Sequence, residues 1–527
     1  MKRKLVFFFL SIVVVGSLVT ILFAKEGTNE FGLAVPTFEE ENLDPVGGTN
    51  DCKWYQTLIY DSLVGIEPPS TGLSTKTGIA YRWEPSPDYK HWTFYLRKGI
   101  KFHNGDELTA EDVKYTLDRA LGPVSRSTNK PSLQNSIDSV EMVDKYTIII
   151  HCKKPDSLLP MEMSEHIGPD AMIVPMNYIK QKGDDHFKRY PIGTGPYKLK
   201  EHVQGSYMLL EAVDKHWALG VPKYKYVRLL CIPEYQARIG LLKRGEVDMI
   251  AVPLEMANEV KSLGFPIVTD PALGVHAIIT HKTWDKNSPL SDIRVREALN
   301  ISIDREAIHK YLFAGFGKSA IYMLGTPASI GYDPVENVPY PYNPERANAL
   351  LKEAGYGPNN PCKIPVYSFP MGGFGEAEKV IETCTSYWKK VGFDITIQKL
   401  PDYGVLRKRW GVDKTLEGSL SPNTIGGRVW SMPVTYAICH TKGGLSVVHN
   451  PEFDSAIEDA LSEVDPKKRA ALAHKAFKIA YDNYIMIPLI EAVGLYGVSP
   501  KTVPDWKNWD MGVTLYDLNW EWVLFPR

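Results

Sequence analysis

The side chains of this 527-residue chain that could take part in chemistry are few, and most stand in incomplete motifs. Gly317-Lys318-Ser319 is similar to the end of a phosphate-binding loop, but Leu312 stands where that loop requires its first glycine. The serine-hydrolase elbow G-x-S-x-G and the zinc-protease motif H-E-x-x-H are both absent. We therefore expect a protein that is not an enzyme, with no catalytic residue and no cofactor.

Histidine and cysteine do not define a metal site either. The thirteen histidines are scattered, and His276 and His281 stand five apart, which places them on neither one helix face nor one strand face. Cys439-His440 could supply two ligands, but an isolated pair is commonly structural. We expect no metal site in the protein.

The first 24 residues have the pattern of an export signal. Residues 1–4 carry three positive charges, and residues 5–24 carry none. Ala24 suits a cleavage site, whereas Leu22 is bulky where a small residue is preferred, and an uncharged run of 20 residues is long enough to span a bilayer. We expect a signal peptide or an N-terminal anchor, and a location outside the cytoplasm.

The six cysteines of an exported chain have 15 possible full pairings. We expect buried thiols together with one or two structural disulfides. The formal net charge is only −2 and the chain has no basic block, so we expect no nucleic-acid partner.

The pattern of elements changes along the chain. Residues 30–110 are rich in turns and strands, for example at 92–96, where Trp92, Phe94 and Leu96 alternate with polar positions. Helix signals and strands alternate over 290–400, including an N-cap, proline and acid at 343–345. The sequence therefore predicts an α/β domain and a separate β-rich domain in a chain too long for one core.

Five motifs then occur in a fixed order along the sequence. They lie at 83–114, with WTFYLRKGIKFHNG at 92–105, at 191–197 (PIGTGPY), at 242–248 (LKRGEVD), at 292–305 (DIRVREAL, then IDR), and at 342–355 (YNPERA, then LLKEAG). Together they resemble the family 5 extracellular solute-binding proteins of ABC transporters, which include dipeptide, oligopeptide and nickel binders.

This resemblance implies an α/β, two-lobed periplasmic-binding-protein fold with an extra β-rich subdomain and a hinge between the lobes. Domain I would be residues 25–50, 190–275 and 490–527, domain II the β-rich insert 51–189, and domain III residues 276–489. The hinge would lie near 275–284 and 487–496. A peptide or peptide-like solute would be captured by hinge closure and delivered to an ABC permease, by a protein expected to be a monomer.

The resemblance also places candidate ligand contacts. They are Thr49, Asn50 and Asp51 at the first crossing, Gly193, Thr194 and Gly195 in domain I, and Asn423, Arg428, Trp430 and Tyr436 in the facing loops. Peptide binders of the family carry an aspartate in this last region that pairs with the ligand's amine, whereas residues 418–438 contain no acid.

Our hypothesis is that Arg428 and Trp430 contact a ligand that presents an acid or a blocked terminus, because a guanidinium favours carboxylates. One alternative is that Arg428 is a solvated loop cation, and another is that Asp51 pairs with a ligand amine. Alternative solutes are a metal chelate, an opine, a sugar oligomer or an organic acid, and nickel would make His281 or His440 the candidate ligands. A membrane-anchored ligand sensor and an exported hydrolase are the remaining alternatives.

Overall fold

The computed structural model describes residues 29–39, 41–48, 52–66, 72–127, 129–166, 168–333, 338–371, 374–416, 418–427, 429–501 and 524. The predicted export signal and four candidate contacts, Thr49, Asn50, Asp51 and Arg428, lie outside these residues. Within the described part of the chain, none of the helices is both long and apolar enough to cross a membrane.

The strands are β1 (Glu30–Val35), β2 (Gly65–Ile66), β3 (Leu73–Ser74), β4 (Ala80–Pro85), β5 (His91–Leu96), β6 (Ile137–Asp144), β7 (Thr147–Cys152), β8 (Tyr197–Val203), β9 (Tyr207–Ala212), β10 (Tyr226–Cys231), β11 (Met249–Ala251), β12 (Ile267–Thr280), β13 (Lys318–Ser319), β14 (Cys362–Ser368), β15 (Phe393–Lys399), β16 (Leu420–Ile425) and β17 (Met486–Val498).

The α-helices are α2 (Lys53–Gln56), α3 (Ala110–Leu121), α4 (Lys130–Ser136), α5 (Leu159–Glu162), α6 (Met176–Lys182), α7 (Asp184–Arg189), α8 (Tyr235–Arg244), α9 (Ala257–Ser262), α10 (Ile293–Ile301), α11 (Arg305–Ala307), α12 (Pro344–Glu353), α13 (Ala377–Val391), α14 (Tyr403–Arg407), α15 (Met432–Cys439), α16 (Pro451–Ser462) and α17 (Pro466–Asp482). Short 3₁₀ turns are η3 (Pro169–Ala171), η4 (Leu254–Met256) and η5 (Pro289–Ser291), and π-helical turns are η6 (Ile308–Leu312) and η7 (Lys408–Val412).

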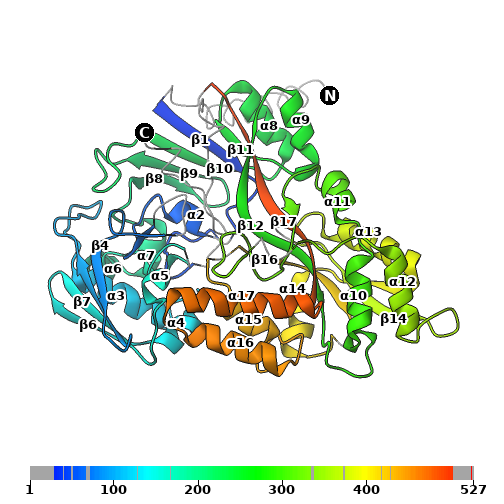
Figure 1. Cartoon of the computed structure of the whole chain (residues 1–527). Helices are drawn as coiled ribbons and strands as arrows, with labels where there is room; N and C mark the ends of the chain where they lie inside the picture. The colour runs from blue at the N-terminus through cyan, green and yellow to red at the C-terminus, as the bar shows by residue number, and fades with distance from the viewer. Residues whose placement is uncertain are drawn as a thin grey trace, which may run out of the picture.

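An 11-stranded sheet runs through the molecule in the order β15-β14-β16-β12-β17-β11-β1-β10-β9-β8, with β13 paired to β17. The long antiparallel strands β12 and β17 lie side by side down its middle (Figure 1). At one end of this pair, β17 is hydrogen-bonded to β11. At the other end, β12 is hydrogen-bonded to β16. We call the part built on β1–β11 the first lobe and the part built on β13–β16 with α10–α17 the second lobe.

A separate four-stranded antiparallel sheet, β4-β5-β7-β6, lies beside the 11-stranded sheet in the first lobe (Figure 1). The predicted alternation over 92–96 is confirmed, because Trp92, Phe94 and Leu96 are buried and the residues between them are not. The odd-numbered residues of β5 therefore face solvent, as the two-residue period of a strand requires.

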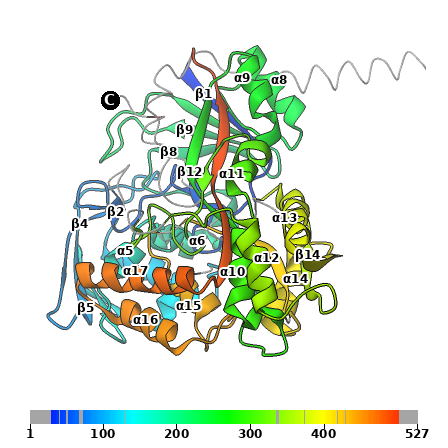
Figure 2. The same ribbon diagram turned by 45° about the vertical axis from the view of Figure 1, so that its right-hand side comes forward.

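Local signals in the sequence set several element boundaries correctly. Asn343 caps α12 by accepting a hydrogen bond from the backbone N–H of Arg346, and the helix begins at the predicted proline. Thr109 and Asp112 form a capping box at the start of α3. The helices α16 and α17 each begin at a proline and pack against each other (Figure 2).

The expected disulfides are the one structural prediction that is wrong. All six cysteines lie among the described residues and none is in a disulfide. They occur on separate elements, five are buried and Cys231 is half-buried, so they fill apolar space instead of cross-linking the chain. The expectation of buried thiols is confirmed for those five.

Candidate functional site

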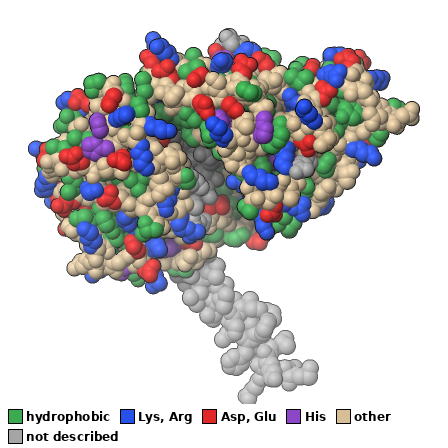
Figure 3. Space-filling model, turned by 90° about the horizontal axis from the view of Figure 1, so that it is seen from below, with side chains coloured by type: hydrophobic (Ala, Val, Ile, Leu, Met, Phe, Trp, Pro, Cys, Tyr) green, Lys and Arg blue, Asp and Glu red, His purple; other side chains and the backbone are tan. Residues whose placement is uncertain are grey.

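The molecular surface is hollowed between the two lobes. Seen from below, a recess separates the left half of the molecule from the right half (Figure 3). The strands β12 and β17 join the lobes on one side of the molecule. A solute held in this recess would therefore meet both lobes.

The end of β16, which we call the β16 wall, belongs to the second lobe. Asn423 is almost fully buried, and its amide donates to the Tyr403 hydroxyl over 3.4 Å. Next to it, Thr424 bonds to His276 of β12 at 2.7 Å, and the His276 ring stacks on Phe374 with 3.8 Å between centroids. Burial lowers the pKa of His276 to about 3, so this ring is neutral and holds β12 against β16.

Gly274 allows β12 and β16 to approach each other at the end of this pairing. Its φ is +123°, a conformation that side chains disfavour, and a Cβ added there would lie 2.2 Å from the Ile425 carbonyl oxygen. The backbone at Ile425 and Gly426 is thus held directly over β12. This contact places the segment that leads to Arg428 and Trp430.

Trp430 and Tyr436 pack in the same hydrophobic core of the second lobe. Trp430 is 6% exposed and belongs to a core cluster with Ile425 and Phe369. Tyr436, on α15, is half-buried and stacks on His440, which bonds to Glu458 at 3.0 Å. Trp430 is therefore positioned beside β16, whereas Tyr436 is tied to the α15–α16 pair.

The first lobe reaches across to Trp430. Leu158, which precedes α5, is 9% exposed and packs in the same cluster as Trp430, together with half-buried Met161. The Arg469 guanidinium of α17 lies over the Trp430 ring at 5.8 Å and donates to the Ser157 hydroxyl. We call this group, Ser157, Leu158, Met161, Trp430 and Arg469, the clasp.

The segment before the undescribed residues 49–51 is held rigidly in the first lobe. Asp44 is fully buried and accepts from both terminal nitrogens of Arg119, at 2.8 and 3.2 Å. Val46 accepts a bond from the backbone N–H of Arg126. On the other side of 49–51, the ammonium of buried Lys53 donates to the Glu165 carbonyl at 2.7 Å. Both ends of this crossing are fixed to the insert that carries the first half of the clasp.

Gly193, Thr194 and Gly195 pack against the chain at 59–61. A Cβ at Gly193 would lie 2.1 Å from the Ile59 oxygen, so the glycines permit backbone contact. The Thr194 hydroxyl donates to Asp61, which also accepts from Trp217 at 2.8 Å. Burial alone would raise the pKa of Asp61, but His216 and these hydrogen bonds lower it. The contacts of Thr194 are those of a structural residue.

The two candidate nickel ligands, His281 and His440, both form hydrogen bonds within the protein. His281 is buried, bonds to the Ser421 hydroxyl at 2.8 Å and packs edge-on against Trp410. Burial lowers its pKa to about 3. In the described residues, no three side chains of His, Cys, Asp or Glu converge on a common metal position.

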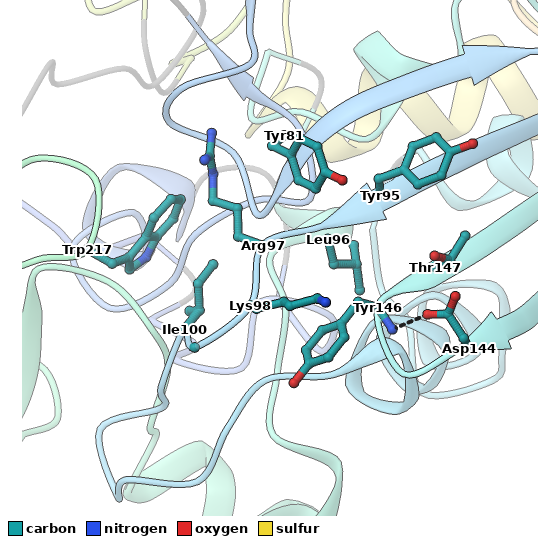
Figure 4. A pocket seen from close by; sticks show the side chains of 11 residues that line it. Tyr81, Tyr95, Leu96, Arg97, Lys98, Ile100, Asp144, Tyr146, Thr147 and Trp217 are labelled. Atoms are coloured by element: carbon teal, nitrogen blue, oxygen red, sulfur yellow. Dashed lines mark hydrogen bonds between the residues drawn. The ribbon is translucent and has the colours of Figure 1, made fainter.

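A separate pocket of about 710 Å³ lies at the end of the four-stranded sheet (Figure 4). Tyr81, Tyr95 and Tyr146 line it together with Trp217, which reaches it from the β9–β10 loop. The Arg97 guanidinium donates to the backbone carbonyls of Thr75, Lys76 and Gly78. Since all of the lining residues come from the first lobe, this pocket is not shared between lobes.

The clasp residues Ser157, Leu158, Met161 and Arg469 were not predicted from the sequence. Ser157 and Arg469 are 312 positions apart, and neither stands in a motif. Leu158 and Leu159 look alike in sequence but face different cores. Only the tertiary arrangement distinguishes them.

Comparison with known proteins identifies the class. Residues 75–424 match the family model of bacterial extracellular solute-binding proteins, family 5. The glutathione-binding protein GsiB of Salmonella paratyphi A is 28% identical over 470 residues, which cover 87% of this chain and 88% of GsiB. This chain belongs to the family 5 extracellular solute-binding proteins.

Two solved structures show the same fold. The periplasmic binding protein DppA from Helicobacter pylori, in complex with the peptide STSA, superimposes with a TM-score of 0.71 at 22% identity and covers 94% of this chain and 98% of its own. NikA from Brucella suis, in complex with Fe(III)-EDTA, has a TM-score of 0.79 at 21% identity and covers 94% and 100%. The predicted two-lobed periplasmic-binding-protein fold is confirmed.

Family membership also confirms the predicted role of this chain as the solute-binding component of an ABC importer. The family consists of substrate-binding proteins, which are not enzymes, and its members act outside the cytoplasm with ABC permeases.

Proposed function

We propose that this protein captures a peptide or peptide-like solute in the recess between its lobes and delivers it to the permease as a monomer, without transforming it. The observation that carries the proposal is the clasp, in which Leu158 of the first lobe is buried among side chains of the second. Contacts of this kind form only when the lobes are together, so they favour closure around a solute.

We propose that three domains are the moving parts. They are domain I (residues 25–50, 190–275 and 490–527), domain II (the β-rich insert, 51–189) and domain III (276–489). The hinge lies along β12 and β17, which are the strands that join the two lobes within the 11-stranded sheet. Bending there would separate Ser157 from Arg469 and open the recess.

A peptide-like solute is supported by two relatives. GsiB is named for glutathione, a tripeptide, and DppA was solved with the peptide STSA. In this chain the loop around Arg428 lacks acids, and the backbone that leads to it is held by Gly274. We propose that Arg428 and Trp430 receive a carboxylate of the solute, with Asn423 behind them.

The first test is native mass spectrometry of the protein purified gently from its own or a related host. A bound mass that fragments as a peptide supports the proposal. A bound metal chelate, opine, sugar oligomer or other non-peptide acid would overturn the substrate class and leave the transport role in place.

A second test addresses Arg428 directly, with glutathione and the tetrapeptide STSA as calorimetric probes. Arg428→Ala should weaken binding of the better probe at least tenfold, because a charged hydrogen-bond partner is lost. Arg407→Ala is the matched control, since Arg407 lies over Trp410 instead. Unchanged binding in Arg428→Ala would contradict a role for this side chain.

A further inference from the structure

Two histidines face each other on the outer surface of the four-stranded sheet. His91 on β5 and His151 on β7 are directly opposite in the antiparallel register. Their Nδ1 atoms lie 2.8 Å apart, with ring planes inclined by 76°. Both residues are at odd positions of their strands, on the face opposite the buried Trp92 and Ile150.

A carboxylate on the next strand orients this pair. Glu141 of β6 lies 2.9 Å from Nε2 of His151. Because a carboxylate accepts hydrogen bonds, the neutral His151 ring carries its proton on Nε2 and presents a lone pair at Nδ1. The short Nδ1–Nδ1 contact then holds one proton, donated by His91. The side chains form a row, His91–His151–Glu141, across three adjacent strands.

This row has the parts of a metal site. Metal-binding histidines commonly donate their second ring N–H to a carboxylate, which is the position of Glu141. Imidazole nitrogens suit the divalent ions of copper, nickel and zinc. A metal ion bound by both Nδ1 atoms would displace the proton that His91 donates to His151, and the neutral His91 ring would then carry its one proton on Nε2.

The separation of the two nitrogens is compatible with neighbouring ligands of a single ion. At metal–nitrogen distances of about 2.0–2.1 Å, atoms 2.8 Å apart subtend about 85–90° at the metal. That is the angle between neighbouring ligands in square-planar or octahedral geometry, which Cu²⁺ and Ni²⁺ adopt. A tetrahedral Zn²⁺ site would need the nitrogens roughly 3.3 Å apart.

We propose that His91 and His151 form a surface site for Cu²⁺ or Ni²⁺, with Glu141 orienting His151. The protein supplies two ligands, in keeping with the lack of a three-residue metal cluster in the described chain, and solvent or a small chelator fills the remaining positions. The site lies on the exposed face of the insert, and its residues belong to neither the clasp nor the β16 wall. The ion bound there is therefore not the transported solute.

The test uses the full chain, produced without a polyhistidine tag and titrated with Cu²⁺ and Ni²⁺ by calorimetry. One Cu²⁺ should bind per chain, and electron paramagnetic resonance should show two equatorial nitrogens. His91→Gln and His151→Gln should each weaken binding at least tenfold. Glu141→Gln should weaken it about tenfold, as for other outer-shell partners of metal ligands.

The matched control is His449→Gln, since His449 is also an exposed histidine but stacks on Trp284. This variant should bind Cu²⁺ as the unaltered protein does. All the substituted side chains lie at the surface, so unchanged thermal unfolding will verify the fold of each variant. Cu²⁺ affinity that is the same in His91→Gln, His151→Gln and the unaltered protein would overturn the proposal, and so would a spectrum with a single nitrogen.

Discussion

The two connections between the lobes differ in kind. At the hinge, β12 and β17 pair through backbone hydrogen bonds over most of their length, and the chain itself crosses. At the clasp, the lobes meet through side chains alone: one arginine bond to a serine and the apolar contacts of Leu158 and Met161. A backbone ladder persists for as long as the fold does, whereas side-chain contacts can part and re-form. The contrast leads us to expect that the hinge governs stability and the clasp governs solute affinity.

Breaking the hinge should have the largest effect. Gly274→Ala places a methyl group against the Ile425 carbonyl and strains the backbone, so we expect the free energy of unfolding to fall by about 3 kcal/mol or more. Urea denaturation measures this. Gly264→Ala has the same sign of φ but an open surrounding, and should cost about 1 kcal/mol. Equal losses in the two variants would contradict the close approach at Gly274.

Substitution of two adjacent leucines, Leu158 and Leu159, tests the clasp and the core of the insert separately. Leu158→Ala removes an apolar contact between lobes, so affinity for the solute should fall about tenfold while the unfolding temperature of the ligand-free protein stays nearly unchanged. Leu159→Ala lies in the insert's own core and should lower the free energy of unfolding by about 2–4 kcal/mol without changing the affinity of the folded protein. If both variants lose only stability, the clasp is part of a fixed core.

Arg469→Gln should act as Leu158→Ala does, to a smaller extent. It removes the bond to Ser157 and the contact with Trp430, and we expect about a fivefold loss of affinity. Small-angle scattering of the ligand-free variant should show a larger radius of gyration. Lys478→Gln, on the same helix but in an exposed pair with Asp482, is the control and should change neither quantity.

The remaining predictions concern pH, and their signs are opposite at the two connections. Burial, with Asp156 and Asp170 nearby, raises the pKa of Glu162, beside the clasp, from 4.5 to about 8. Its contribution to stability is therefore complete below pH 4.5 and is lost as pH rises toward 8. Burial lowers the pKa of His276, on β12, from 6.5 to about 3, so its contribution is complete above pH 6.5 and is lost toward pH 3.

Urea denaturation between pH 3 and 9 checks both signs. Glu162→Gln should flatten the decline in stability on the alkaline side only, and His276→Gln should flatten the decline on the acid side only. A variant that flattens both limbs would show that hinge and clasp are one titrating unit.

The sequence predicted what local chemistry determines. Alternation at Trp92 and Phe94 and the cap at Asn343 depend on neighbours a few positions away, and these elements were placed correctly. The five family motifs also allowed the two-lobed fold to be predicted. The disulfide expectation failed because pairing depends on where cysteines from distant elements meet.

The candidate site was less accessible to sequence reasoning. The contacts proposed at Arg428 and at 49–51 remain predictions that lie outside the described residues. The Thr194 hydroxyl donates a hydrogen bond to Asp61, and no local sequence pattern predicts this contact. The clasp and the His91–His151 pair join positions 312 and 60 apart, respectively, and in each case only the folded arrangement brings ordinary residues together.

The pairing of β12 with β17 also has a mechanical consequence. Because both strands run between the lobes and are bonded along their length, a force that pulls the lobes apart is shared by two chains in parallel. Such a ribbon bends across its face more readily than it shears in its plane. The strand register shifts between Asp270 and Gly274 and again between His276 and Ala277. The regular hydrogen-bond pattern is interrupted at these two places, so the pair bends more easily there. The lobes should therefore rotate relative to each other about a single axis that passes near these register shifts.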